Sequence, residues 1–354
     1  MKKRLISILL ILSLCPVLLC ACAGKKERAD VFYYTFSDTY ISSVRTDLKK
    51  KLADRGLSST DYDGSGSQTT QTEQVRTALT GGAKVLLVNI VNTGSDDAAT
   101  EIVNLAKNAN VPLVFFNREV GDSIINSYDG CAFVGTKAEE AGILQGEMIG
   151  EYLLEHYSEL DLNGDGRISY ILFKGEEGNN EAIYRTKYSV EKANELLAAA
   201  GKKPLVFYDS ANKNEYLVDK NGQWSAAAAN EYMTTALTTN NAANKNMIEL
   251  VICNNDGMAE GAVSALNAAG YNKGKGSPTI PVFGVDATEA AVALIRDGKM
   301  TGTVRQDAEG MADALSLLAS NAAEGKALMD GTDRFSVDSA VRKIRIPYAK
   351  YFGE

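Results

Sequence analysis

The segment Asp161–Ser169 has the residue spacing of a calcium-binding loop. Such a loop offers acid or amide oxygens at its first, third and fifth positions, a glycine at the sixth, and a backbone carbonyl at the seventh. The twelfth position should be a bidentate glutamate but is Leu172, and the residues after Ser169 predict a strand. The segment is therefore either an Asx-rich turn or a calcium loop that a distant acid completes, and we favour the calcium loop. Its expected Ca²⁺ ligands are Asp161, Asn163, Asp165, Arg167 (through its carbonyl) and Ser169.

A second group of polar and aromatic residues follows the apolar runs that predict strands. In open α/β sheets, ligands bind beyond the carboxyl ends of the strands, so these side chains should gather at one edge. Carboxylates, amides and a guanidinium can accept from and donate to the hydroxyls of a neutral polyol, and Tyr40 and Trp224 could stack on a sugar ring. A helix cap is the simpler role for an Asp or Asn after a strand, and we favour it for Asn254 and Asp256. The candidate sugar-binding residues are Tyr34, Asp38, Tyr40, Asn117, Asn179, Glu181, Arg185, Trp224, Asn255, Asp286 and Gln306.

The elements that would position these residues alternate between short apolar runs and amphipathic segments. Runs such as 84–91, 168–173 and 280–285 are too continuous for half-exposed strands and indicate parallel strands covered on both faces. Thr136 with Glu139 predicts a capping box that opens a helix over 136–157.

We expect an α/β fold of two doubly wound parallel-sheet lobes with a ligand cleft between them. The N-terminal lobe should comprise 29–136 plus 307–346, and the C-terminal lobe 137–306 plus 347–354. Three crossovers near Thr136, Asp307 and Pro347 would join the lobes, and 210–223 should form a surface loop.

The first residues resemble an export signal, because a basic start precedes a short apolar run. We expect residues 1–21 to be the signal peptide, with an uncleaved membrane anchor as the alternative. Cys22 follows a small residue and is the best candidate for lipidation, so 22–28 would be the lipidated cysteine and a tether. The protein would then be held by lipid to the outer face of the cell membrane.

The composition excludes several classes of protein. A formal net charge of −8 argues against nucleic-acid binding. Beyond Cys22 only Cys131 and Cys253 remain, too few for a disulfide framework, and we expect both to be buried as small hydrophobes. We expect a monomer.

The chain from about Ala29 to Tyr348 resembles the galactose/glucose-binding branch of the two-lobed periplasmic binding proteins of ABC importers. The resemblance is strongest at 111–117, 161–176, 254–256 and 280–286. It implies a hexose held between closing lobes, with hydroxyls bound by Tyr34, Asp38, Asn117, Arg185, Asn255 and Asp286 and the ring stacked on Tyr40 and Trp224. It also implies that Glu249 completes the calcium loop, that Ser169 is a weak or water-mediated ligand, and that the sugar passes to a membrane permease.

Three positions depart from the pattern of that family. Asn179 replaces a histidine, Glu181 an aspartate and Gln306 an asparagine. Each change alters the reach of a side chain, and sites that pair hydroxyls with buried polar groups discriminate strongly on such details. The resemblance therefore implies a hexose, D-galactose, D-glucose or a close relative, without deciding which.

The sequence argues against two other functions and leaves a third open. A glycosidase needs two catalytic carboxylates, but no pair stands out, His156 is the only histidine, and no common hydrolase or nucleotide motif occurs. We therefore expect no enzymatic activity. The export signal and acidic charge exclude a sugar-responsive repressor. A sensor that presents bound sugar to a membrane receptor stays open, because a receptor and a permease would both recognise the closed lobes.

Overall fold

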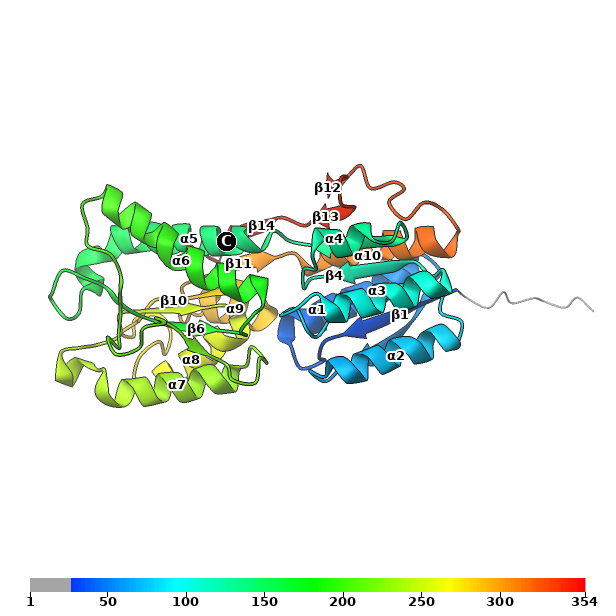
Figure 1. The fold of residues 1–354 in the computed structure, drawn as a ribbon. Coiled ribbons are helices and arrows are strands. Elements are labelled where there is room, and N and C mark those ends of the chain that lie inside the picture. Colours follow the sequence, from blue (N-terminus) through cyan, green and yellow to red (C-terminus); the bar gives the residue numbers. More distant parts are fainter. Residues whose placement is uncertain (1–26, 354) are drawn as a thin grey trace, which may run out of the picture.

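The computed structural model describes residues 27–353 and shows two lobes side by side (Figure 1). The predicted signal peptide and the lipidation site at Cys22 lie outside the described residues. No helix in the described part of the chain is both long and apolar enough to cross a membrane.

The first lobe contains the chain from β1 to β5 and a returning C-terminal segment. Its elements are β1 (Arg28–Tyr33), α1 (Thr39–Asp54), β2 (Ser58–Asp63), α2 (Gln68–Thr80), β3 (Leu86–Val88), α3 (Asp97–Ala109), β4 (Leu113–Phe116), α4 (Asp122–Asn126), β5 (Cys131–Gly135), α10 (Ala308–Ala323), β12 (Ser336–Asp338) and β13 (Lys343–Arg345).

The second lobe contains the middle of the chain and the last strand. Its elements are α5 (Ala138–Leu160), β6 (Ser169–Lys174), α6 (Asn180–Ala199), β7 (Val206–Phe207), β8 (Leu217–Val218), α7 (Ala226–Thr239), the short 3₁₀ helix η1 (Ala242–Asn244), β9 (Leu250–Cys253), α8 (Asp256–Ala268), β10 (Val282–Asp286), α9 (Glu289–Arg296), β11 (Gly302–Gln306) and β14 (Tyr348–Tyr351).

Each lobe is built on one mainly parallel sheet. The strand order is β12-β13-β5-β4-β3-β1-β2 in the first and β14-β11-β10-β9-β6-β7 in the second, where β8 also pairs with β6. Antiparallel pairing joins β12 to β13 and β11 to β14, while the pairs along the rest of both sheets are parallel. The parallel, doubly wound fold expected from the apolar runs is confirmed, with antiparallel strands at edges supplied by the C-terminal segment.

Helices cover both faces of each sheet, which explains why the strands read as continuous apolar runs. In the first lobe, α1 and α10 pack on one face, and α2, α3 and α4 on the other. In the second lobe, α5 and α6 cover one face, and α7, α8 and α9 the other. These layers hold the strands rigidly, so their carboxyl ends keep fixed positions.

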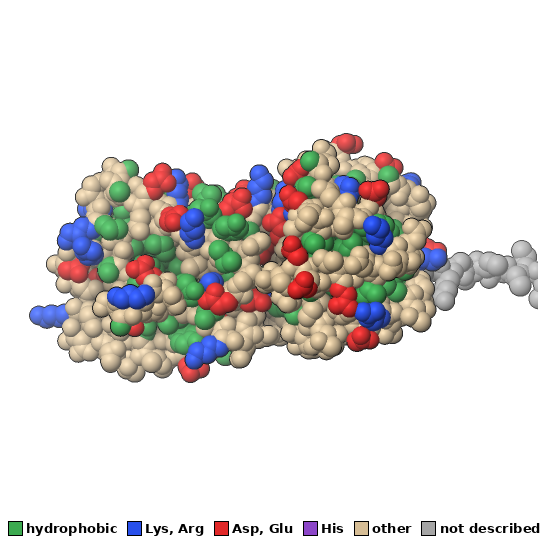
Figure 2. Space-filling model, viewed as in Figure 1, with side chains coloured by type: hydrophobic (Ala, Val, Ile, Leu, Met, Phe, Trp, Pro, Cys, Tyr) green, Lys and Arg blue, Asp and Glu red, His purple; other side chains and the backbone are tan. Residues whose placement is uncertain are grey.

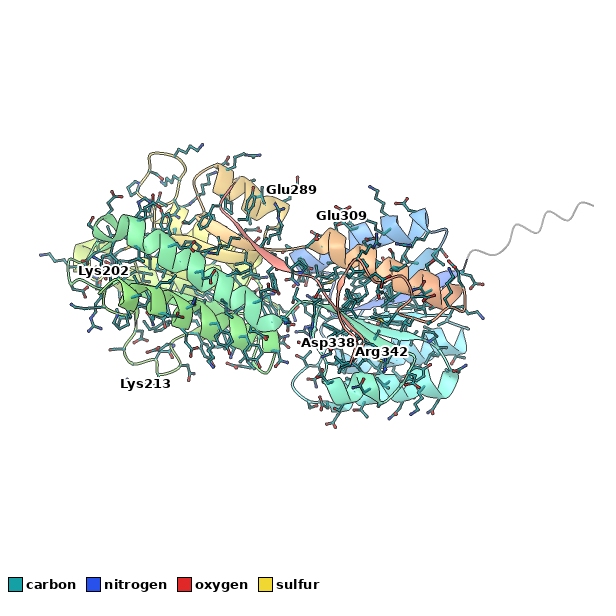
Figure 3. All side chains as sticks on the ribbon, turned by 90° about the horizontal axis from the view of Figure 1, so that it is seen from above. Lys202, Lys213, Glu289, Glu309, Asp338 and Arg342 are labelled. Atoms are coloured by element: carbon teal, nitrogen blue, oxygen red, sulfur yellow. The ribbon has the colours of Figure 1, made fainter. Side chains whose placement is uncertain are left out.

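The chain passes between the lobes after β5, after β11 and between β13 and β14. Viewed from above, Glu289 and Glu309 lie on opposite sides of this junction (Figure 3). Near it, the hydroxyls of Thr136 and Tyr348 are 2.9 Å apart, and Arg345 donates to the Thr136 carbonyl at 2.6 Å. Polar contacts therefore tie two of the connecting segments to each other.

Two local expectations were wrong. The predicted capping box does not form, because α5 begins at Ala138 after Lys137, and Thr136 bonds to Tyr348 instead. Arg28, placed in the tether, begins β1, and its guanidinium pairs with Asp30. The segment 210–223 is largely a surface loop, as predicted, and it also contains the short strand β8, which pairs with β6.

Candidate functional site

The eleven predicted sugar-binding side chains line a single cavity between the lobes. Strand ends of both sheets meet there, as expected for open α/β sheets. The predicted residues in the lining are Tyr34, Asp38, Tyr40, Asn117, Asn179, Glu181, Arg185, Trp224, Asn255, Asp286 and Gln306, and Ile41 and Arg118 complete it. The structure thus brings these residues together, and their binding of sugar stays a prediction.

Arg185 is the central cation of the cavity and is held in place by several hydrogen bonds. It projects from α6, is 3% exposed, and donates through Nη1 to the Asn254 carbonyl at 2.8 Å. Its Nη2 donates to Gln306 Oε1 and to the Tyr348 hydroxyl, both at 3.0 Å. A guanidinium fixed on two nitrogens has little freedom left, so its third nitrogen has a defined direction.

Two donors in this group have no hydrogen-bond partner among the described residues. They are Arg185 Nε and Gln306 Nε2, and both are buried. Buried polar atoms are nearly always paired in folded proteins, and an unpaired one costs about 1–3 kcal/mol. The cavity therefore presents donors that a ligand with acceptor oxygens would satisfy.

Two buried carboxylates supply matching acceptors. Burial raises the pKa of the Asp286 carboxyl well above its usual range, while the Arg185 charge opposes that rise. Asp286 Oδ1 lies 4.0 Å from Arg185 Nη1. Burial likewise raises the pKa of Glu181, and Arg185 again opposes the change. Hydroxyl groups that donate to these carboxylates would stabilise their ionised forms.

The backbone at the end of β10 is strained. Asp286 has a φ of 129° and the next residue, Ala287, a φ of 58°. Residues other than glycine rarely adopt positive φ, and such strain is concentrated at binding and active sites. It directs the Asp286 carboxylate into the cavity at the carboxyl end of the sheet.

Trp224 forms an aromatic wall above Gly175. A Cβ atom at Gly175 would lie 2.0 Å from the indole Cδ2, so the ring occupies the space of a side chain that glycine lacks. The Arg185 guanidinium carbon lies 5.7 Å from the ring centre. Trp224 itself has a φ of 55°, and its carbonyl accepts from Asn255 Nδ2 at 3.2 Å.

The first lobe contributes a hydrogen-bonded pair and a turn residue. The Tyr34 hydroxyl donates to Asp38 Oδ2 at 2.6 Å, and Asp38 Oδ1 accepts the Ile41 amide at the start of α1. Asn117 has a φ of 61°, a conformation that Asn tolerates, and its Oδ1 accepts from Asn89 Nδ2 at 3.0 Å. The Asn117 amide nitrogen thereby points away from Asn89.

Three of the predicted residues also cap helices. Asp38 caps α1, Asn179 caps α6 and Asn255 caps α8. The expectation that Asn254 and Asp256 are caps was wrong. Asn254 Oδ1 accepts the Gly175 amide, and Asp256 accepts from the Thr303 hydroxyl at 2.6 Å and the Thr288 amide at 2.8 Å.

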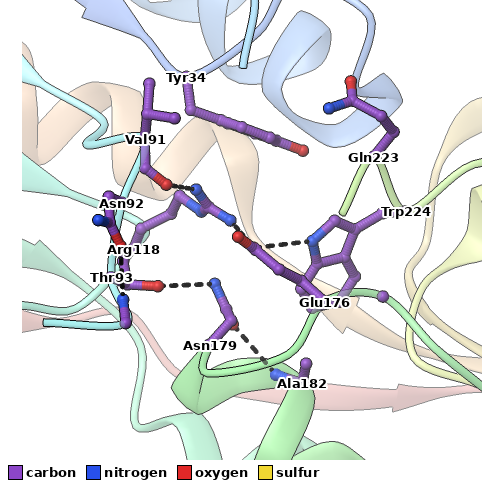
Figure 4. Close-up of polar contacts among 12 residues, drawn as sticks. Tyr34, Val91, Asn92, Thr93, Arg118, Glu176, Asn179, Ala182, Gln223 and Trp224 are labelled. Carbon is purple, nitrogen blue, oxygen red and sulfur yellow. Dashed lines mark hydrogen bonds and ion pairs between the residues drawn. The ribbon is translucent and has the colours of Figure 1, made fainter. Parts of the chain in front are cut away.

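Sequence reasoning missed Arg118 and its partner Glu176. Arg118 follows Asn117 after β4, and its guanidinium forms an ion pair with Glu176, which follows β6 in the other lobe (Figure 4). The only signal for them in the sequence was their position beside Asn117 and Gly175. Burial raises the pKa of Glu176, and Arg118 opposes the rise.

The predicted calcium loop precedes β6, whereas the cavity residues of this segment follow the carboxyl end of that strand, and the loop is held by its own hydrogen bonds. Asp161 accepts the amides of Asp165 and Gly166 at 3.1 and 2.9 Å. Glu249 reaches the loop, where its two oxygens accept the amides of Asn163 at 2.8 Å and Ser169 at 2.7 Å. An acid that directly precedes β9 (Leu250–Cys253) therefore meets the loop.

The remaining loop donors fit a metal less well. Asn163 uses both side-chain atoms on the Met247 backbone, and the Ser169 hydroxyl donates to the Met247 carbonyl at 2.7 Å. Among residues 27–353, no group of three or more His, Cys, Asp or Glu is placed to hold a metal ion. Ca²⁺ ligation by Asn163 and Ser169 would require these bonds to be exchanged.

Cys131, Cys253 and His156 lie outside the cavity lining. Cys131 and Cys253 are buried free thiols, as expected. His156 is partly exposed and packs against Tyr152 at the end of α5. Figure 2 shows acidic and basic side chains scattered over both lobes on the face in view.

The amino-acid sequence is similar to those of known periplasmic binding proteins. The sequence pattern of the family described as "Periplasmic binding protein domain" matches residues 29–327. The chain is 36% identical over 323 residues to the D-galactose/methyl-galactoside binding periplasmic protein MglB of Haemophilus influenzae, covering 91% of this chain and 88% of that protein.

Solved structures share the fold. An ABC transporter solute binding protein from Clostridium phytofermentans with bound β-D-glucose is 19% identical, with a TM-score of 0.72 and coverage of 92% of this chain and 94% of that one. One from Bacillus halodurans with bound myo-inositol is 23% identical, with a TM-score of 0.69 and coverage of 93% and 95%.

Proposed function

Since the chain belongs to the periplasmic binding protein family, we propose that it captures a hexose between its lobes and delivers it to an ABC permease. Its relatives are sugar-binding transport proteins and not enzymes. The observation that supports a hexose is that one cavity contains both unpartnered buried donors and buried acceptors. The donors are Arg185 Nε and Gln306 Nε2, and the acceptors are the carboxylates of Glu181 and Asp286. A polyol donates and accepts at each hydroxyl, so it satisfies both kinds of group.

The proposed mechanism is ligand-stabilised closure. Asp38 and Asn117 belong to the first lobe, and Arg185 and Asp286 to the second, so one sugar would bond to both. Such a ligand binds the closed form better than the open form and shifts the population towards it. The closed lobes are then the surface that a permease, or alternatively a sensor receptor, would recognise.

The experiment is calorimetric titration of residues 23–354 with D-galactose and D-glucose, using L-arabinose and D-ribose as controls. We expect micromolar or tighter binding of a hexose, weaker binding of the pentoses, and no turnover. The 36% identity to the D-galactose/methyl-galactoside binding protein favours D-galactose. Absence of heat with every sugar would refute the hexose proposal. Light scattering on the same sample tests the monomer.

A calcium site at 161–169 is part of the same proposal. Asp161, Asp165, the Arg167 carbonyl and Glu249 would be the main oxygen donors, with Asn163 and Ser169 joining after exchange of their bonds to Met247. We expect CaCl₂ to raise the melting temperature of chelator-treated protein and Glu249→Gln to abolish that rise. Equal melting temperatures with and without Ca²⁺ would refute the site.

Lipid anchoring at Cys22 completes the proposal. Mass spectrometry of protein from membranes should find the mature chain beginning at Cys22 with a diacylglycerol on its sulfur. The variant Cys22→Ala should lose that mass and leave the membrane fraction. A mature N-terminus at another residue would contradict the assignment.

A further inference from the structure

The ion pair between Arg118 and Glu176 bridges the two lobes at the edge of the cavity (Figure 4). Arg118 follows β4 of the first lobe, and Glu176 follows β6 of the second. Their side chains are 5% and 23% exposed. The pair is therefore largely shielded from water, and opposite charges attract more strongly there than in water.

Each partner is fixed within its own lobe. The Arg118 guanidinium donates to the carbonyls of Ile90 and Val91 and lies over the Tyr34 ring, 4.2 Å from its centre. Glu176 accepts the indole N–H of Trp224 at 3.5 Å. Because both side chains are already ordered by contacts in their own lobes, pairing them on closure costs little additional side-chain entropy.

A weaker contact lies beside the ion pair. Asn179 Nδ2 donates to the Thr93 hydroxyl at 3.5 Å, while Asn179 Oδ1 caps α6. At the same rim, a Cβ at Gly178 would lie 3.4 Å from the Gly94 Cα. The lobes thus approach closely along one edge, and the ion pair is the strongest bond across it.

We propose that Arg118 and Glu176 form a charge latch that stabilises the closed form and thereby sets affinity and sugar release. This deepens the proposed function and rests on it. The apparent dissociation constant equals the intrinsic one divided by the fraction of closed, binding-competent protein. Weakening the latch at Glu176, which is not part of the cavity lining, lowers that fraction without removing a bond to the sugar.

The latch would make sugar affinity depend on ionic strength, which contacts to a neutral ligand alone would not. A hexose carries no charge, so its own contacts have little dependence on ionic strength. Closure that forms an ion pair does depend on it, because salt screens the two charges when they separate into water. Sugar affinity of the wild-type protein should therefore fall as salt rises, and Glu176→Gln should lose this dependence.

The test is a double-mutant cycle with Arg118→Met and Glu176→Gln, read by calorimetry with the sugar that the wild-type protein binds. Glu177→Gln is the matched control, since Glu177 pairs with Lys174 and Tyr216 of its own lobe. We expect Glu176→Gln to weaken binding about tenfold, Glu177→Gln to leave it unchanged, and the double variant to bind no more weakly than Arg118→Met. Independent effects of the two substitutions, or a Glu176→Gln affinity within twofold of wild type, would overturn the latch.

Small-angle scattering separates this inference from the proposed function. Without sugar and at low salt, the wild-type protein should have a smaller radius of gyration than Glu176→Gln, and the difference should shrink at high salt. If no sugar binds, the hexose proposal fails, but the comparison of the two radii still tests the latch. Equal radii at low salt would then overturn the latch.

Discussion

Replacement of Asp286 by asparagine tests the candidate site most directly. The substitution keeps the shape of a buried side chain that projects from strained backbone, and removes its charge. A hydrogen bond to a charged group contributes about 1.5–3 kcal/mol, against about 0.5–1.5 kcal/mol for a neutral pair. The amide also presents N–H groups where a sugar hydroxyl would donate.

The expected loss of sugar affinity follows from these hydrogen-bond energies. Loss of about 1.5–3 kcal/mol corresponds to a dissociation constant roughly 10- to 150-fold higher. Calorimetry with the bound hexose measures it. Asp30→Asn is the matched control, because Asp30 is also buried but bonds to Arg28 and Tyr62 outside the cavity. That variant should bind sugar as the wild-type protein does, whatever its melting temperature.

The pH dependence gives a second result from the same variant. Burial raises the pKa of Asp286 above its ordinary value of 3.8, so protonation begins at a higher pH than for an exposed Asp. Because sugar should favour the ionised carboxylate, affinity should fall as the pH drops through that raised pKa. Asp286→Asn should lose part of this dependence, and Glu181, whose pKa burial also raises, should keep the rest. A variant affinity within twofold of wild type across this range would refute the assignment of Asp286.

Three further predictions concern stability and the wall of the cavity. Burial raises the pKa of Asp256 from 3.8 to about 7. The folded protein therefore holds this proton more tightly than the unfolded chain does, and the free energy of unfolding should decrease as the pH rises from about 4 to about 7. Urea unfolding of Asp256→Asn should show this loss reduced by about 2–4 kcal/mol, and an unchanged pH profile would contradict it. Lys343→Met should lower the unfolding free energy by about 1–3 kcal/mol, because the buried Lys343 ammonium donates to Glu119 and to the Val120 carbonyl. The more exposed Lys350→Met should cost at most about 1 kcal/mol. Gly175→Ala should displace the buried Trp224 ring, weaken sugar binding about three- to tenfold and lower the unfolding free energy by about 1–3 kcal/mol. Calorimetry and urea unfolding would measure both effects, and full affinity would mean that the ring position is unimportant.

The buried framework could be predicted from the sequence, and short edge elements could not. Runs such as 168–173 stand out because both faces of their strands are covered by helices. By contrast β2, with the sequence Ser-Ser-Thr-Asp-Tyr-Asp, lies at a sheet edge and carries no apolar pattern. The strands β12 and β13 depend on pairing with distant parts of the chain, which no local pattern reveals.

The site residues were found because parallel strands end at one edge, but their individual roles depend on distances. Asn254, Asn255 and Asp256 are consecutive and chemically alike, so the identity of the cap depends on the exact residue at which α8 begins. Arg118 and Glu176 lie far apart in the chain, and only the relative position of the two lobes brings their charges together. In the same way, the sequence predicts Asn163 as a metal ligand but not that its side chain bonds to the Met247 backbone, because Met247 is distant in the chain.

Trp224 is the only tryptophan in the sequence, and it lies in the wall of the cavity. Its indole N–H is 3.5 Å from the Glu176 carboxylate, and its ring centre is 5.7 Å from the Arg185 guanidinium carbon. Indole emission responds to nearby charges and to water, and a ligand in the cavity would alter both. All of the tryptophan fluorescence of this protein therefore originates at one wall of the cleft, and the native chain is its own optical reporter of occupancy, without any attached dye.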